Sequence, residues 1–185
     1  MVNPVQRRAT YADLLEVPEN RVGEIIDGEL ITQPRPAAPH ARAASRLGVE
    51  LGPLDRIKSG PGGWIILDEP ELHLHGDALV PDLAGWRRER MLELPDVAAF
   101  ELAPDWVCEV LSPSTQSHDR VRKMRVYARE SVGHVWLVDP SAQTLEVYRR
   151  VDGSWLRSQV AQGDEKIRAE PFSELELNLA ALWER

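Results

Sequence analysis

Two apolar runs separated by a basic amphipathic segment form the clearest hydrophobic pattern in the chain. Trp106–Leu111 is an apolar run of strand length with one carboxylate, Glu109, in its middle, and His134–Val138 is a second such run. The segment between them has helical periodicity. Two strands joined by one helix form a βαβ unit, in which the strands are parallel neighbours. The pattern therefore predicts that Glu109 lies in a central strand that leads into a basic helix.

The helix of this βαβ unit is predicted to begin at Ser117 or Asp119, either of which can cap it, and to end at Gly133. Its periodicity separates an apolar face, which should pack on the sheet, from a neighbouring polar face. The apolar face consists of Val121, Met124 and Ala128, and the polar face of Arg120, Lys123 and Tyr127. From this helix, Lys123 is placed to reach back toward the strand that carries Glu109.

Turn signals and alternating apolar positions predict the remaining elements. Asp27-Gly28 between two apolar-rich runs is typical of a two-residue hairpin turn, and Asp152-Gly153 predicts a second hairpin near the C-terminus. Thr10 and Asp13 resemble a capping box at the start of a short helix. A further helix is expected over 39–57, where Gly52-Pro53 can shorten or kink it, with a surface turn of helix over 87–94 and a last amphipathic turn through Trp183. Further strands are expected over 64–67, 78–84 and 166–168, and a turn at 60–63.

These elements together predict the fold class. Strands and helices alternate, and no internal repeat, low-complexity segment or domain linker interrupts the 185 residues. We expect a single domain over 1–185, of α/β class, with a central mixed β-sheet flanked by helices and an antiparallel hairpin at the C-terminal side.

Composition narrows the functional classes. A net charge of −8 argues against a non-specific nucleic-acid coat, because such binding depends on neutralising phosphates. It still allows one basic site, such as the helix with Arg120, Arg122, Lys123, Arg125 and Arg129, although a solvated helix face explains these cations equally well. The single cysteine, Cys108, fits a buried inert thiol in a reducing compartment. The N-terminus lacks the apolar core of a signal peptide and no stretch is apolar enough to span a membrane, so we expect a cytoplasmic protein.

Two carboxylates occupy unusual positions inside apolar strands. Glu109 is one, and Asp82, directly after Pro81 in the predicted strand 78–84, is the other. Proline breaks a strand ladder, which leaves Asp82 outside regular pairing. Carboxylates on adjacent strands repel each other unless a cation lies between them, and oxygen ligands suit Mg²⁺ or Mn²⁺. Such a site would polarise a phosphodiester, with Lys123 offsetting the charge of the transition state. By spacing alone, two strand-end acids and a surface lysine are the simpler interpretation.

Other acidic and histidine side chains give weaker signals. Glu24 and Glu29, on either side of the Asp27-Gly28 turn, qualify as active-site carboxylates only if they face inward, and exposed hairpin charges are commoner. His73 and His75 point to the same side of a strand if one is present, which would allow both to bind a metal. No third soft ligand lies nearby in the sequence, so polar strand faces are the favoured interpretation.

Successive motifs along the chain resemble one protein family. They are Glu24-Ile25-Ile26-Asp27-Gly28-Glu29-Leu30, Val80-Pro81-Asp82-Leu83, Glu109-Val110-Leu111-Ser112-Pro113-Ser114-Thr115, Asp119, Lys123, Tyr127 and Val132-Gly133-His134-Val135-Trp136-Leu137-Val138-Asp139-Pro140. The sequence is similar to the Uma-type endonuclease-like proteins, a bacterial branch of the PD-(D/E)XK restriction-endonuclease-like superfamily. The likeness runs from about Thr10 to Trp183, and the Glu-Val-Leu-Ser-Pro-Ser and Trp-Leu-Val-Asp-Pro segments are its most specific parts.

The resemblance implies a restriction-endonuclease-like fold and Mg²⁺- or Mn²⁺-dependent cleavage of DNA. Asp82 and Glu109 match the metal-binding acids, and Glu24 matches a further acidic position. The sequence departs at Leu111, where the superfamily usually has lysine, and the resemblance suggests that Lys123 supplies this charge from the helix. His40 matches a histidine position to which we assign no role. Because duplex-cutting members of the superfamily often work as dimers, a homodimer is also suggested.

Three functions remain open at this point. The first is a metal-dependent endodeoxyribonuclease with Asp82, Glu109, Lys123 and Glu24 in its active site. The second is a catalytically inactive module that keeps the nuclease fold and binds nucleic acid or regulates a partner, which the acidic charge and Leu111 favour. The third is a metal-dependent phosphohydrolase of small molecules. Cleavage assays and metal binding distinguish them.

Overall fold

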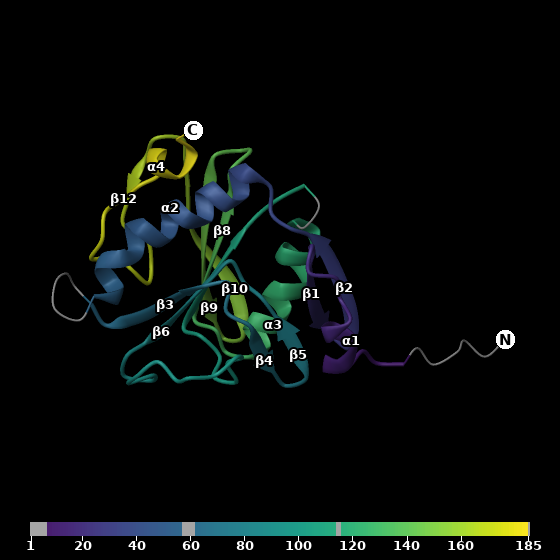
Figure 1. The fold of residues 1–185 in the computed structure, drawn as a ribbon. Coiled ribbons are helices and arrows are strands. Elements are labelled where there is room, and N and C mark those ends of the chain that lie inside the picture. The colour runs from purple at the N-terminus through teal and green to yellow at the C-terminus, as the bar shows by residue number, and fades with distance from the viewer. Residues whose placement is uncertain (1–6, 57–61, 114–115, 185) are drawn as a thin grey trace.

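A six-stranded mixed sheet forms the larger layer of the computed structural model, which describes residues 7–56, 62–113 and 116–184 (Figure 1). Its strand order is β10-β9-β8-β7-β6-β3. The strands span Trp64–Asp68 (β3), Leu83–Arg87 (β6), Trp106–Val110 (β7), His134–Asp139 (β8), Thr144–Val151 (β9) and Ser154–Gln162 (β10). β7 and β8 pair in parallel and the other neighbours are antiparallel, so the predicted βαβ unit and C-terminal hairpin are confirmed.

A four-stranded antiparallel sheet lies beside it, with the order β2-β1-β5-β4. The strands span Arg21–Ile26 (β1), Glu29–Pro34 (β2), Leu72–Leu74 (β4) and Asp77–Leu79 (β5). The predicted hairpin at Asp27-Gly28 is confirmed, since both residues have positive φ, 55° and 79°, as a type I′ turn requires. The capping box of Thr10 and Asp13 is also present, and α1 spans Tyr11–Leu15.

The two sheets are joined at Val80-Pro81-Asp82. The sequence predicted one strand over 78–84, and this is wrong: β5 ends at Leu79, β6 begins at Leu83, and each half belongs to a different sheet. Pro81 has no N–H to donate to a ladder, which is why the strand breaks there. Asp82 therefore lies at the junction of the sheets.

Helix α2 (Ala38–Asp55) crosses one face of the six-stranded sheet, with α4 (Ala180–Trp183) beside it (Figure 1). Ala43, Leu47, Leu51 and Leu54 are fully buried, in the register that the periodicity predicted. Pro53 lies inside the helix, which continues to Asp55. The predicted end at Ile57 lies outside the described residues, as do residues 60 and 61 of the expected turn at 60–63. β11 (Lys166–Ile167) and β12 (Leu177–Asn178) form a two-stranded ladder that completes this core.

The helix after β7 differs from its prediction. It begins with one wide π-helical segment, η1 (His118–Lys123), and continues as α3 (Met124–Arg129). The predicted apolar face is wrong at Val121, which is 56% exposed, whereas Lys123 and Tyr127, predicted on the polar face, are buried. An i→i+5 turn changes which side chains face inward, and such turns are common at functional sites.

Of the surface turn of helix predicted over 87–94, only a turn at 88–90 is present, where the backbone N–H groups of Arg90 and Met91 donate to the Arg87 carbonyl oxygen. Arg87 ends β6, paired with Trp64 of β3, and its backbone N–H donates to Asp105 Oδ2 at 2.8 Å. The Arg87 guanidinium also lies 4.6 Å from the centre of the Trp64 ring. These sheet contacts override the local helical propensity of a charged segment.

None of the helices in the described part of the chain has the length and apolar character needed to span a membrane.

Candidate active site

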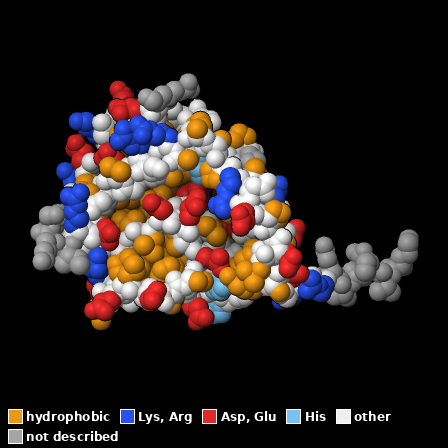
Figure 2. Space-filling model, viewed as in Figure 1, with side chains coloured by type: hydrophobic (Ala, Val, Ile, Leu, Met, Phe, Trp, Pro, Cys, Tyr) orange, Lys and Arg blue, Asp and Glu red, His pale blue; other side chains and the backbone are white. Residues whose placement is uncertain are grey.

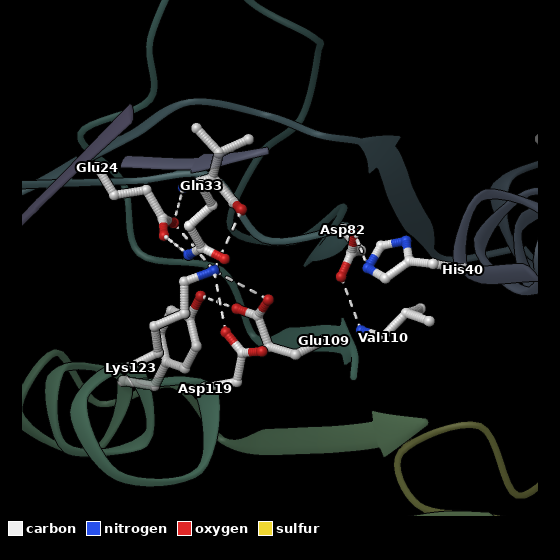
Figure 3. Close-up of polar contacts among 10 residues, drawn as sticks. Glu24, Gln33, His40, Asp82, Glu109, Val110, Asp119 and Lys123 are labelled. Atoms are coloured by element: carbon white, nitrogen blue, oxygen red, sulfur yellow. Dashed lines mark hydrogen bonds and ion pairs between the residues drawn. The ribbon is translucent and has the colours of Figure 1, made fainter. Parts of the chain in front are cut away.

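The ammonium group of Lys123 lies among three carboxylates. Its Nζ is 2.9 Å from Glu24 Oε1, 3.0 Å from Glu109 Oε2 and 3.7 Å from Asp119 Oδ1 (Figure 3). All four side chains are 2–4% exposed. The expectation that Lys123 reaches back to Glu109 is confirmed. Charges this deeply buried are stable only when they are paired and hydrogen-bonded, so the cluster is an arranged site and not a surface ion pair.

Glu24 reaches the cluster from the smaller sheet. It lies in β1, where burial increases toward Ile26, and its Oε1 also accepts a hydrogen bond of 2.8 Å from the backbone N–H of Val80. The amide of Gln33, on β2, donates to Glu24 Oε2 at 3.3 Å. Glu29, the other hairpin acid, is exposed and pairs with Arg122 at 2.9 Å. The sequence left open whether Glu24 or Glu29 faces inward. In the structure Glu24 is buried beside Lys123, whereas Glu29 is exposed.

Glu109 and its partners come from the larger sheet and the following helix. Asp119 and Lys123 are four residues apart on η1, and the π-helical turn brings both to the side of Glu109. The hydroxyl of the buried Tyr127, one turn further on, donates to Glu109 Oε1. Both Glu109 oxygens are thus held by donors on the helix, which fixes the orientation of this carboxylate.

Asp82 lies next to this cluster and not inside it. Its Oδ2 accepts a 2.7 Å hydrogen bond from the backbone N–H of Val110, and its Oδ1 is 3.3 Å from His40 Nε2 (Figure 3). β6 and β7 pair Leu83 with Cys108, so continuing the antiparallel register by one residue sets Asp82 opposite Glu109. The structure therefore brings Asp82 and Glu109 to neighbouring positions, while within the described residues Lys123 pairs with Glu109 and not with Asp82.

Burial and charge shift the pKa values of this site. Burial raises the pKa of Glu109 well above its ordinary 4.5; the Lys123 ammonium opposes this, and the acids Asp119, Asp82 and Glu24 raise it further. Burial alone would lower the pKa of Lys123, but the carboxylates of Glu109 and Glu24 hold it well above 10.5. Burial would likewise lower the pKa of His40, and Asp82 raises it above 6.5. Lys123 thus stays charged, and additional positive charge near Glu109 would favour its ionised form.

A cavity of about 600 Å³ opens onto these side chains. Its walls come from the hairpin β1–β2, the start of α2, the sheet junction and η1. Its functional lining consists of Glu24, His40, Asp82, Glu109, Asp119 and Lys123. Although the cluster is almost fully buried, it therefore forms part of the wall of this cavity.

The donor set fits a hard divalent cation. In the described ranges no three His, Cys, Asp or Glu side chains are already arranged as a metal-binding group. Mg²⁺, however, commonly uses only one or two carboxylates and completes its shell with water and phosphate oxygens. Glu24, Glu109 and Asp119 surround the Lys123 ammonium, and Asp82 lies opposite Glu109 in the neighbouring strand register. The four carboxylates outnumber this one positive charge, and a divalent cation would offset the excess. The Asp82 and Glu109 oxygens suit such an ion.

The histidine pair His73 and His75 does not form the metal site that was considered as an alternative. His73 lies in β4 and contacts Glu71 at 2.6 Å, whereas His75 lies in the following turn, with φ of 46°, and contacts Glu130. The strand ends between them, so the two imidazoles do not share a face. Cys108 is a free, fully buried thiol in β7, as expected, and burial raises its pKa.

Sequence reasoning missed part of the site. Asp119 was considered as a helix cap and a motif residue, and its four-residue spacing from Lys123 was the available signal for an ion pair. His40 was given no role, yet it contacts Asp82 and its buried Nδ1 has no hydrogen-bond partner in the described structure. Gln33 had no signal in the sequence, because only the hairpin register places it beside Glu24.

Comparison with known proteins now identifies the family. A model of the Uma2 family, described as "Putative restriction endonuclease", matches residues 9–180. The chain belongs to the Uma2 family. Of the residues quoted above for the resemblance to this family, Glu24, Asp82, Glu109, Asp119 and Lys123 line one cavity. No curated protein matches the chain.

The fold of this Uma2 protein also has a solved counterpart. The crystal structure of "a putative nuclease belonging to DUF820" from Anabaena variabilis ATCC 29413 superimposes with a TM-score of 0.76 at 24% sequence identity. The match covers 95% of this chain and 97% of that one. At this identity the comparison shows a common fold, which confirms the predicted nuclease-like α/β architecture over nearly the whole chain.

Proposed function

We propose that this protein is a divalent-cation-dependent endonuclease that hydrolyses phosphodiester bonds in DNA. The observation that carries the proposal is the Lys123 ammonium, buried among Glu24, Glu109 and Asp119 at a cavity that Asp82 also lines. Membership of a restriction-endonuclease family supports the reaction class.

Asp82 and Glu109 are the side chains that would hold the metal. Bound there, Mg²⁺ or Mn²⁺ would polarise the phosphodiester and lower the pKa of a bound water. The chain itself supplies the orientation: the Val110 N–H and His40 fix Asp82, while Tyr127 and Lys123 fix Glu109. Because each carboxylate is held by two donors, little reorganisation is needed when substrate arrives.

Lys123 is the electrostatic partner of the reaction. Its raised pKa keeps it an ammonium at neutral pH, and its position beside Glu109 puts positive charge where negative charge develops on the phosphoryl oxygens. Leu111, at the usual position of the superfamily lysine, is buried and aliphatic. Lys123 reaches the same carboxylate from η1, so the missing strand lysine has a replacement.

The cleavage assay should use plasmid, single-stranded and branched DNA with Mg²⁺ or Mn²⁺. We expect cleavage by the wild type, and at least a hundredfold slower cleavage by Asp82→Asn and by Glu109→Gln, since each removes a charge from the metal-binding pair. Glu29→Gln is the matched control, because Glu29 is an exposed carboxylate on the same hairpin as Glu24. Calorimetry should show Mg²⁺ or Mn²⁺ binding that the two site variants lose.

Other outcomes identify other functions. DNA binding without cleavage under any metal condition would favour the non-cleaving module, to which Leu111 points. Turnover of nucleotides without cleavage of polymers would favour a small-molecule phosphohydrolase. The homodimer suggested by the resemblance stays a prediction, and light scattering of the purified protein checks it.

A further inference from the structure

Most of the basic side chains on the helix after β7 form ion pairs with carboxylates of the same molecule. Arg120 pairs with Glu146, Arg122 with Glu29, and Arg129 with Asp77, Asp27 and Glu130. Lys123 is buried in the acidic cluster. Four of the five cations that the sequence allowed as one basic site therefore have carboxylate partners. A polyanion would have to displace these partners, so this helix is a poor candidate for the phosphate-binding surface.

Two other arginines line the cavity and keep their charge uncompensated. Arg21, at the start of β1, donates to Thr32 Oγ1 at 3.2 Å and to the Thr32 carbonyl oxygen at 2.8 Å. Arg35, directly after β2, donates to the Glu19 carbonyl oxygen at 3.3 Å. Within the described residues, neither forms an ion pair with a carboxylate. Their contacts are neutral oxygens, which orient the guanidinium groups and leave several N–H donors and both charges available.

Both arginines lie at the open end of the hairpin β1–β2, away from its Asp27-Gly28 turn. Arg21 pairs with Pro34 across β1 and β2, and Arg35 is the next residue of the chain. Positive charges that lack a carboxylate partner favour the binding of an anion. A phosphate oxygen is the anion that guanidinium groups match best, because their planar N–H donors can bind it in pairs.

The cavity needs such a positive rim if it accepts DNA. Acidic side chains surround the hollow in the middle of the face shown in Figure 2, with Lys and Arg side chains at its border. The acidic residues that line the cavity are Glu19, Glu24, Glu69, Glu71, Asp82, Glu109 and Asp119, and its only Lys and Arg side chains in the described ranges are Arg21, Arg35 and Lys123. Because Lys123 is paired with carboxylates of the cluster, Arg21 and Arg35 are the cations in this described lining that can attract a polyanion.

We propose that Arg21 and Arg35 bind the phosphate backbone of the DNA strand that enters the cavity, an assignment that rests on the proposed function. The same hairpin carries Glu24 on β1, and Arg35 precedes the helix that carries His40. Phosphates held by the arginines would thus be bound on the wall next to the cluster, in the orientation that presents a neighbouring phosphodiester to Asp82 and Glu109.

The test measures DNA affinity against salt concentration. Fluorescence anisotropy of labelled single-stranded and duplex oligonucleotides should be followed with the full-length wild type and with the double variant Arg21→Gln/Arg35→Gln. The slope of log K against log[salt] is negative, and each lost phosphate contact reduces its magnitude by about 0.9 for duplex DNA and about 0.7 for a single strand. We therefore expect the magnitude of the slope to be smaller in the double variant by about 1.4 for the single strand and about 1.8 for the duplex. Its affinity at 0.1 M salt should be about tenfold lower or more.

Two matched variants separate charge from folding. Arg21→Lys/Arg35→Lys keeps the positive charge and should restore most of the salt slope, which a merely structural role in the hairpin would not. Arg125→Gln removes an exposed cation from the basic helix and should leave binding unchanged. Wild-type binding by the double glutamine variant, loss of affinity in Arg125→Gln instead, or no binding of either oligonucleotide by the wild type would each overturn the assignment. Arginine-dependent binding without cleavage would instead overturn only the proposed reaction.

Discussion

Lys123 is the residue on which the acidic cluster depends. Its ammonium group is the shared partner of Glu24, Glu109 and Asp119, all buried. Removing one partner from a buried ion pair leaves uncompensated charge, which typically costs about 3–5 kcal/mol. Since three acids would lose the same partner, the site should respond strongly to this single change.

We therefore predict that Lys123→Met lowers the free energy of unfolding by about 3–5 kcal/mol in buffer without divalent cations. Urea unfolding measures this, with Lys166→Met, on the exposed side of β11, as the control. Cleavage should be lost while calorimetry still detects Mg²⁺ binding, because the lysine acts on the transition state and not on the cation. Metal affinity that collapses together with cleavage would contradict this role.

Glu109 is the residue at which stability and function oppose each other. Burial raises its pKa well above 4.5, and the neighbouring acids add to the effect despite Lys123. Burial thus opposes its ionised form, and a bound cation would favour that form. Glutamine has the same shape and no charge, so it should relieve this cost.

Glu109→Gln should accordingly have a melting temperature equal to or above that of the wild type at pH 8 in the presence of a chelator. Addition of Mg²⁺ should raise the melting temperature of the wild type, by an amount that corresponds to about 2.7 kcal/mol at a hundred times the dissociation constant. The variant should gain no such stability. Differential scanning fluorimetry with Glu29→Gln as control checks both results, and a clearly less stable Glu109→Gln protein in chelator would argue that Glu109 is mainly a structural partner of Lys123.

Among the secondary-structure elements, η1 is the one whose position matters most, because it carries both Asp119 and Lys123. A second network ties it to the sheet: Glu146 of β9, only 8% exposed, accepts hydrogen bonds from Arg120 of η1, from Tyr148 and from Arg157 of β10. Burial acts to raise the pKa of Glu146, but these donors hold it at about 2, below the ordinary 4.5. The network thus favours the ionised carboxylate.

The lowered pKa of Glu146 determines how its contribution to stability changes with pH. The contribution of Glu146 to stability is present above about pH 4.5 and is lost as the pH falls toward 2. Glu146→Gln should lower the free energy of unfolding by about 1–3 kcal/mol at pH 7 and should lose less stability than the wild type between pH 4.5 and pH 3. Urea titrations at several pH values measure this, with the exposed Glu176→Gln as control. Parallel pH profiles for wild type and Glu146→Gln would be inconsistent with the network.

Elements specified by local patterns could be predicted from the sequence. The two hairpin turns, the buried face of α2 and the parallel β7–β8 pair follow from glycine conformation and apolar periodicity. The strand over 78–84 could not be resolved, because nothing local to Pro81 says that its two sides join different sheets. The buried face of η1 was also misjudged, since periodicity treats Lys123 as polar and only distant acids explain its burial.

For the molecule as a whole, the candidate site lies where its layers meet. Glu24 belongs to the four-stranded sheet, Glu109 to the six-stranded sheet, Asp82 to the segment that joins them, and His40 to α2. Glu109 was predictable as a charge inside an apolar strand, and Asp82 as a carboxylate after a strand-breaking proline. Their convergence with Glu24 was not, because it depends on how two sheets pack.

The central claim is that Asp82, in the segment that joins the two sheets, and Glu109, in the six-stranded sheet, hold one divalent cation beside Lys123. Anomalous diffraction from crystals soaked in Mn²⁺ tests it most directly. The account predicts one anomalous peak in contact with both the Asp82 and the Glu109 carboxylates, lost in crystals of Glu109→Gln. Well-ordered crystals with no peak there, or with manganese bound only at other acidic side chains, would contradict it.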